Sequence, residues 1–240
     1  MATTPLHAQI LSITPTPQAN SPLFRMLPAE VRENIFSYAL TDYPDPSPGR
    51  EYDSETCYTR PSYFAPRRTD TSLLQTCRAA YAESWFLPFM LREQVHWLTA
   101  RDRAPPEYSG TTDLEGSLRR ITAQLGEEKI EIAGLRVFAQ MYRIEQGEME
   151  SLMATPGLHP RALTLTIRHT DWWYWETDEP MRFEARWLRQ ALPSSVREVR
   201  IELESTMRRK DQVDAIAKQM REKWFFVRAD GRVLYADATG

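Results

Sequence analysis

The residues with the clearest capacity for chemistry lie in the stretch IRHTDWWYWETDEP, residues 167 to 180. His169, Asp171 and Glu176 could supply a general base and two carboxylates, because a histidine beside an acid exchanges protons near neutral pH. They follow a strand-like alternation, and α/β proteins often place their sites beyond the carboxyl ends of strands. Two acids and one histidine are nevertheless common in loops by chance. An unrecognised hydrolase is therefore kept as an alternative, and the expectation is a protein that is not an enzyme.

Other catalytic and cofactor motifs are absent from the sequence. It has no GxGxxG or Walker-type loop, no HExxH or CxxC, and no GxSxG nucleophile elbow. The four histidines, His7, His96, His159 and His169, do not have the spacing of metal ligands. We expect neither a metal nor a cofactor.

Four consecutive aromatic residues, 172 to 175, follow Asp171 in the same stretch. They could form a platform for a small molecule or nucleic acid, a protein-docking surface, or a plug for the hydrophobic core. Exposing all four rings would create an unusually large apolar patch. We therefore expect some of Trp172, Trp173 and Trp175 to pack against a helix that carries Phe183 and Trp187, and at least one ring to stay accessible as an anchor for a partner.

Composition places the 240-residue chain among globular proteins, with 42% hydrophobic and 26% charged residues. A net charge of −3 argues against a dedicated nucleic-acid binder. Two cysteines, Cys57 and Cys77, are too few for a disulfide framework. The sequence shows no secretory signal and no run that is long enough to span a bilayer, so a cytoplasmic or nuclear protein is expected.

The first 92 residues predict an arm and two helices. Residues 1 to 22 lack charged side chains and are expected to be a flexible arm. The stretch SPLFRMLPAEVRENIFSYAL predicts a helix with Pro28 near its start. A proline-rich loop over residues 42 to 70 follows, and a second helix is expected from residue 71 or 72 to Pro88, because Leu73, Cys77, Tyr81 and Trp85 recur at every fourth position.

Residues 93 to 240 alternate between strand-like and helix-like patterns, which predicts an α/β domain with a mainly parallel sheet. Strands are expected at 94–98, 134–142, 162–168 and 196–204, and helices at 117–125, 148–154, 181–192 and 210–223. A closing hairpin is expected around a two-residue turn at Asp230-Gly231.

The predicted strands carry apolar and polar residues in alternation, so we expect helices on one face and an open polar face, as in leucine-rich-repeat-like proteins. The alternative is a single-layer α+β sheet whose second face is covered by the N-terminal helices. The polar positions are expected to lie side by side; they are Arg136, Gln140, Thr164, Thr166, Arg168, Arg200 and Glu202. Of these, Arg136, Arg168 and Arg200 are candidate partner-binding residues together with the three tryptophans of the loop.

Two segments carry a family resemblance. FRMLPAEVRENIFSYAL and SLLQTCRAAYAESWFLPF resemble the F-box-like N-terminal region of many fungal proteins, and the match covers residues 23 to about 90. It implies docking to a Skp-type adaptor of a cullin-RING ubiquitin ligase, with a following domain that recruits a partner protein. The resemblance assigns adaptor contact to Leu27, Pro28, Val31 and Ile35, and the second-helix signature to Leu74, Cys77 and Arg78.

The loop between these two segments is longer than in an ordinary F-box, and we expect residues 42 to 70 to modulate adaptor binding. The alternative is that the apolar residues of both helices serve only to pack the helices against the sheet.

Overall fold

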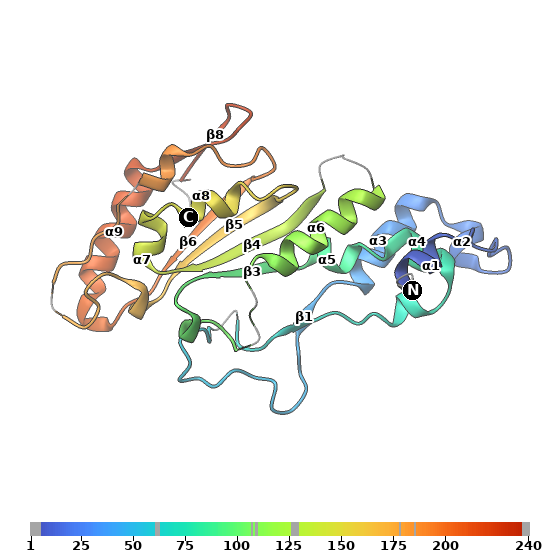
Figure 1. Ribbon diagram of the computed structural model, residues 1–240, viewed down its shortest axis with the longest axis horizontal. Helices are drawn as coiled ribbons and strands as arrows, with labels where there is room; N and C mark the ends of the chain where they lie inside the picture. Colours follow the sequence, from blue (N-terminus) through green and yellow to red (C-terminus); the bar gives the residue numbers. More distant parts are fainter. Residues whose placement is uncertain are drawn as a thin grey trace, which may run out of the picture. The chain divides into compact units, whose positions relative to one another are not determined.

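The computed structural model describes residues 6–60, 63–106, 108, 110–125, 130–177, 179–184 and 186–236. The chain forms two compact units (Figure 1). Unit 1 comprises Met1–Tyr52 and Pro61–Arg92, and unit 2 comprises Asp53–Arg60 and Glu93–Gly240. The short stretch 53–60 thus leaves the N-terminal unit and folds with the C-terminal one.

Unit 1 is helical. Its helices are α1 (Leu6–Leu11), α2 (Pro22–Met26), α3 (Ala29–Ala39), the 3-10 helix η1 (Ser72–Gln75), α4 (Arg78–Ser84) and α5 (Leu87–Leu91). Strands β1 (Tyr43–Pro44) and β2 (Arg67–Arg68) pair antiparallel and close the intervening loop. The helices enclose a core of Phe36, Leu40, Ala80 and Leu87, against which Leu74 and other partly buried apolar side chains pack.

Two expectations for unit 1 are wrong in part. Residues 6–11 of the expected arm form α1, where the His7 ring meets Trp85 edge-on at 4.4 Å and its Nδ1 lies 2.8 Å from the Tyr81 hydroxyl. The expected second helix is interrupted at Cys77, whose backbone is extended (φ −159°, ψ 161°). Its thiol accepts a hydrogen bond from the Ala80 amide, so Cys77 caps α4 rather than continuing a single helix.

Unit 2 is built on a four-stranded parallel sheet in the order β3-β4-β5-β6, which confirms the α/β class. The strands are β3 (Glu93–Leu98), β4 (Glu131–Ala139), β5 (His159–Ile167) and β6 (Glu198–Leu203). The connections contain α6 (Thr112–Leu125), α7 (Met141–Glu145) and α8 (Glu148–Met153), and α9 (Lys210–Lys223) follows β6. Short 3-10 helices lie between them: η2 (Arg101–Arg103), η3 (His169–Asp171), η4 (Arg186–Arg189) and η5 (Met207–Arg209).

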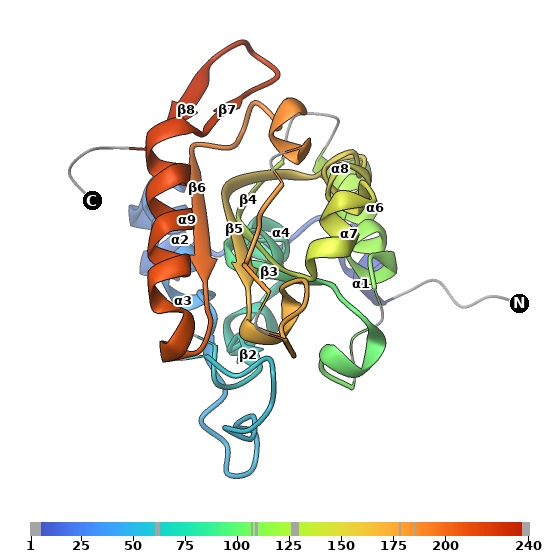
Figure 2. The same cartoon turned by 90° about the vertical axis from the view of Figure 1, so that its left-hand side faces the viewer.

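The parallel register aligns the apolar positions of neighbouring strands. Leu135 pairs with Leu163, which pairs with Val199, and the next row joins Val137 and Leu165. The four side chains of these rows that lie on β4 and β5, namely Leu135, Val137, Leu163 and Leu165, are fully buried. Figure 2 shows α6, α7 and α8 gathered on one side of the strands, and α9 running alongside β6.

The expectation of an open polar face is wrong at its central positions. Arg136 and Arg200 do lie in line with Thr164, but Arg136 is only 6% exposed, and Thr164, Thr166 and Arg168 are buried. Arg136 donates from Nε to Glu93 at 3.0 Å and from Nη1 to Glu202 at 2.6 Å. Arg136 and Thr166 therefore hydrogen-bond across the strands, to each other and to the partly exposed Glu202, instead of facing solvent.

Gln140 and Arg200, at the margins of the same set, also have partners within the chain. The Gln140 Oε1 accepts from the Ala100 amide at 2.6 Å. The exposed Arg200 makes two hydrogen bonds to Glu198, at 2.6 and 2.8 Å. These contacts belong to the fold of unit 2.

The segment 181–192 does not form the expected helix. In its described part, only the short η4 is helical, although Met181 and Trp187 are buried. The ring centroid of Trp187 lies 6.3 Å from that of Trp224 and 5.3 Å from that of Phe226. Tertiary contacts of large side chains thus replace a helical repeat here.

The closing hairpin is confirmed, with a different turn. Strands β7 (Phe225–Val227) and β8 (Val233–Tyr235) pair antiparallel. The Arg228 amide donates to the Arg232 carbonyl at 2.8 Å, and Gly231 has φ +80°. The loop therefore has three residues with glycine in the left-handed conformation, not two.

Candidate interaction sites

A buried ion pair anchors the loop that follows β5. The strand ends at Ile167, and η3 then places Asp171 beside Arg168. Arg168 donates from Nη2 to the Asp171 carboxylate at 3.1 Å and from Nε at 2.5 Å. The two side chains are 1% and 0% exposed. A buried arginine needs all of its donors satisfied, which fixes the start of the loop.

The remaining donor of Arg168 binds backbone from two distant segments. Its Nη1 donates to the carbonyl oxygens of Cys57 and Arg103, each at 3.0 Å. Its guanidinium lies over the ring of Phe138, 5.3 Å from the centroid. Arg168 is therefore a structural residue that joins the stretch 53–60 to the end of the sheet, and it has no surface to offer a partner.

Arg60 joins the same stretch to β6. Its Nε lies 2.8 Å from Glu204, and its side chain is 13% exposed. Burial lowers the pKa of the Arg60 guanidinium, and the carboxylate of Glu204 opposes that change. The stretch 53–60 is thus held by charged contacts at both Cys57 and Arg60.

The rings of the aromatic loop divide between core and surface. Trp172 is 3% exposed, and its indole donates to the Glu204 carbonyl at 2.8 Å while its ring meets Phe183 edge-on. Trp173 is half-buried and donates to Glu145 at 2.9 Å. Trp175, also half-buried, lies 5.8 Å from the ring of His169 and 5.6 Å from the guanidinium of Arg103. Trp172 is therefore a core residue, whereas Trp173 and Trp175 keep part of their surface exposed.

Tyr174 is the most exposed ring of the loop, at 44%. Among the described non-glycine residues it alone has a positive φ, +53°, which costs a residue with a Cβ on the order of 1 kcal/mol or more. The Arg182 guanidinium lies 5.9 Å from the centroid of its ring. The sequence pointed to the tryptophans as partner contacts and not to Tyr174, because nothing in an aromatic run signals which residue adopts the left-handed conformation.

The three residues considered for catalysis are not arranged as a unit. Asp171 is committed to Arg168, and Glu176 is exposed. The His169 Nδ1 lies 3.3 Å from the Ser205 hydroxyl, a neighbour from the end of β6 that the sequence did not suggest. Within the part of the chain that the structure describes, no carboxylate hydrogen-bonds His169, and no group of three or more His, Cys, Asp or Glu side chains could hold a metal ion.

The residues expected to contact an adaptor lie between α2 and α3 and on α3 itself, in unit 1. Leu27, half-buried, caps the end of α2, and its carbonyl accepts from Arg32 at 2.7 Å. Pro28 is exposed at the start of α3. Val31 and Ile35 are each 41% exposed. Of the second-helix signature, Leu74 and Cys77 pack against the core of unit 1, and Arg78 begins α4.

Among the described residues, no helix has the length and apolar character needed to cross a membrane. Comparison of the chain with family models, curated proteins and solved structures found no match, so its function has to be inferred from its own residues.

Proposed function

We propose that this protein is a protein-interaction module in which α3 docks onto a Skp-type adaptor of a cullin-RING ubiquitin ligase, while unit 2 recruits a partner through the loop 172–175. The F-box-like pairing of the segments 24–40 and 72–89 supports the choice of adaptor. Such a module would act in the cytoplasm or nucleus. Recognition of a small molecule or nucleic acid by the same loop, or a hydrolase activity, would be the alternatives.

The observation that carries the proposal is an apolar stripe on the solvent side of α3. Val31, Ile35 and Tyr38 follow one another at i, i+4 and i+7 and are 41%, 41% and 86% exposed. The opposite face of the helix holds Phe36, which is fully buried. A helix with one apolar face in the core and a second facing solvent suits docking into a groove of another protein.

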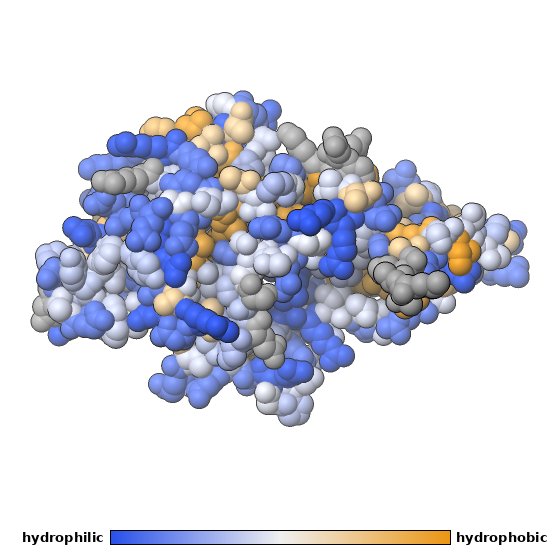
Figure 3. All heavy atoms as spheres, viewed as in Figure 1, coloured by the Kyte–Doolittle hydropathy of each residue, from blue (hydrophilic) through white to orange (hydrophobic). Residues whose placement is uncertain are grey.

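The stripe is held in a fixed position. Arg32 makes two hydrogen bonds of 2.9 Å to Glu83, which joins α3 to α4. Met26, at the end of α2, is another exposed apolar side chain of unit 1, at 74%. Apolar atoms are also visible at the surface over the N-terminal helices in Figure 3. A preorganised apolar surface favours binding because little conformational entropy is lost on association.

The experiment is a binding measurement between the full chain and a purified Skp-type adaptor, by surface plasmon resonance. We expect Ile35→Asp to weaken binding by at least a hundredfold, because it places a charge in the centre of the buried contact. Ser37→Asp introduces the same charge two residues along α3, on the other side of the helix, and should leave binding within about threefold.

Two outcomes would reject the adaptor. Either neither the unmodified chain nor a chain with a shortened loop binds, or both substitutions weaken binding equally. The loop is shortened within residues 46–49. These residues lie outside the stretch 53–60, so the deletion leaves the contacts of Cys57 and Arg60 with unit 2 in place. Absence of binding in the shortened chain too would show that the helices are purely structural.

The partner-recruiting role of the loop is tested separately, with Tyr174→Gly. This substitution removes the exposed ring without adding strain, because glycine adopts positive φ readily. Affinity purification of the unmodified chain and of this variant should then differ in one specific protein. If both recover the same proteins, Tyr174 is not an anchor.

A further inference from the structure

Unit 2 contains a groove that the proposed interactions do not use. It lies between β6, α9 and the closing hairpin, and has a volume of about 670 Å³. This is within the range of roughly 300–1,000 Å³ that is typical of small-molecule pockets. Its floor is formed by Val199, Ile201 and Leu203, which are half-buried although they belong to the apolar side of the sheet.

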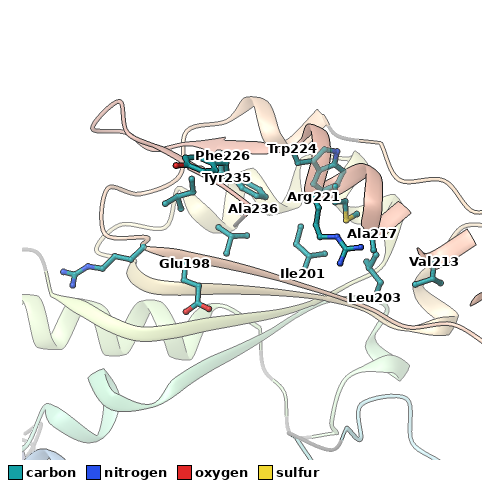
Figure 4. A pocket seen from close by; sticks show the side chains of 14 residues that line it. Glu198, Ile201, Leu203, Val213, Ala217, Arg221, Trp224, Phe226, Tyr235 and Ala236 are labelled. Carbon is teal, nitrogen blue, oxygen red and sulfur yellow. The ribbon is translucent and has the colours of Figure 1, made fainter. Parts of the chain in front are cut away.

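Apolar and aromatic side chains also form the other walls. On α9 they are Val213, Ala217 and Met220, and the residues that follow α9 contribute Trp224, Phe226 and Leu234. Figure 4 shows Ile201 and Leu203 pointing from the strand toward α9, while Glu198 points away from the groove. The interior is therefore apolar, and would hold a hydrocarbon chain or a ring in preference to water.

One cation interrupts this apolar lining. The guanidinium of Arg221 points from α9 toward Ile201 and Leu203 (Figure 4). The other charged groups of the lining have partners: Arg197 pairs with Glu131 at 3.2 Å, and Glu198 with Arg200 at 2.6 Å. Within the described residues, Arg221 has no ion pair. An arginine in this position offers a carboxylate two parallel hydrogen bonds at the edge of an apolar space.

We propose that the groove binds a monomeric amphipathic carboxylic acid, whose carboxylate pairs with Arg221 and whose hydrocarbon part lies on β6 between α9 and the hairpin. Charge complementarity selects an acid over a neutral amphiphile. The apolar walls select a chain or ring of several carbons over a small anion. This site is separate from α3 and from the loop 172–175, so its failure would leave the proposed function untouched.

The test compares decanoate with decanol by isothermal titration calorimetry on the full chain, at concentrations below those at which decanoate forms micelles. We expect saturable binding of one decanoate per chain and binding of decanol about tenfold weaker. Arg221→Gln should weaken decanoate binding by about tenfold and leave decanol unchanged, because it removes only the charged hydrogen bonds.

Two further variants complete the design. Lys218→Gln removes the same charge one turn away on α9, outside the lining, and should change decanoate binding by less than twofold. Ala217→Trp fills the groove and should abolish binding of both ligands, with circular dichroism to show that the variant is folded. Because Arg221 is exposed, its substitution tests the site even if Ala217→Trp fails to fold.

Several results would overturn the proposal. One is no saturable binding of decanoate, or binding only once micelles form. Others are equal affinity for decanol, or equal effects of Arg221→Gln and Lys218→Gln. Self-association of the ligand-free chain that Ala217→Trp abolishes would show that the groove holds a second copy of the protein instead.

Discussion

Arg168 and Asp171 form an ion pair from which solvent is excluded. The contribution of such a pair to the free energy of unfolding differs from that of a pair at the surface. Each charge has lost its hydration, so its free energy depends on the groups that the protein places around it, above all on the opposite charge. Exposed pairs such as Arg200 with Glu198 keep most of their hydration and contribute little. The two kinds of pair within unit 2 allow a matched comparison.

Replacing Asp171 by Asn should lower the free energy of unfolding by about 3–5 kcal/mol, because the guanidinium of Arg168 would remain buried without its counter-charge. Urea denaturation followed by circular dichroism measures this. Glu198→Gln serves as the control, with a loss below about 1 kcal/mol. Similar small losses in both variants would show that the pair does not hold the loop.

His96 gives unit 2 a dependence on pH. It lies buried on β3 with the Tyr108 hydroxyl as its neighbour, and burial lowers the pKa of its imidazole from 6.5 to about 4. Below pH 6.5 the imidazole of His96 binds a proton in the unfolded chain but stays neutral in the folded chain. The free energy of unfolding therefore decreases as the pH falls toward 4. The loss is about 3 kcal/mol, from ~1.4 kcal/mol per pH unit.

Unfolding free energies at a series of pH values should therefore fall more steeply in the unmodified protein than in His96→Gln, which has no group to titrate. Both proteins contain the same carboxylates. Subtracting one curve of unfolding free energy against pH from the other therefore leaves the contribution of His96 alone. Parallel curves would mean that His96 accepts a proton in the folded state.

The sequence predicted the division of the aromatic loop but not its details. Crowding of four large rings requires that some be buried, and Trp172 packs on Phe183 as this argument implies. The identity of the exposed ring depends on the backbone conformation at Tyr174, and the contacts of Arg168 depend on Cys57, more than a hundred residues earlier. Such long-range pairing leaves no periodic signal, so an arginine expected at the surface proved to be buried.

At the scale of elements, periodicity succeeded where one side of an element faces a core. The strands β3 to β6 and the helices α6 and α9 were expected within about five residues of their ends, because apolar residues recur along them at every second position in strands and at every third or fourth position in helices. The last residues of the expected strand 134–142 are an exception, because Met141 and Tyr142 belong to α7. Periodicity gave the wrong prediction at Cys77. The apolar residues recur at every fourth position on both sides of it, yet Cys77 itself caps α4 and is not part of a continuous helix. It failed again at 181–192, where Met181 and Trp187 are buried by separate tertiary contacts.

Two glycines of unit 2, one within a helix and one between two helices, should respond in opposite directions to replacement by alanine. Gly116 lies within α6, with open space around the position of a Cβ, so Gly116→Ala should stabilise the protein by about 0.4–1 kcal/mol. Gly147, between α7 and α8, has φ +86°, and Gly147→Ala should destabilise it by about 1–2 kcal/mol. Thermal melting of both variants gives the comparison; a shift of the same sign in both would contradict it.

At the scale of the whole molecule, the chain passes between its two units three times, after Tyr52, after Arg60 and after Arg92. Unit 2 is therefore not contained in residues 93–240. Composition and strand–helix alternation predicted its class, but no local pattern marks Asp53–Arg60 as part of it. The loop over residues 42 to 70 was expected to lie on the surface, because it holds five prolines and many polar residues.

Residues 93–240 alone should unfold at a lower urea concentration than unit 2 in the full chain. The buried Arg168 would lose the Cys57 carbonyl as an acceptor, at a cost of about 1–3 kcal/mol. Joining residues 53–60 to the start of this fragment through a flexible glycine–serine linker should restore much of the loss. The same stretch with Arg60→Ala, which cannot pair with Glu204, should restore less. Equal stability of all three chains would show that the stretch is dispensable.

The path of residues 53–60 also imposes an order of events during synthesis. This stretch leaves the ribosome long before its binding site, which is complete only when Glu204 has been made. From residue 60 to residue 204 the ribosome adds 144 residues, which takes roughly 7–30 s at ~5–20 residues per second. During that time residues 53–60 of the nascent chain have been made, but the residues that they bind in the folded protein have not all been made. The rate of translation, as well as the final free energy, thus bears on how much of this protein reaches its folded state.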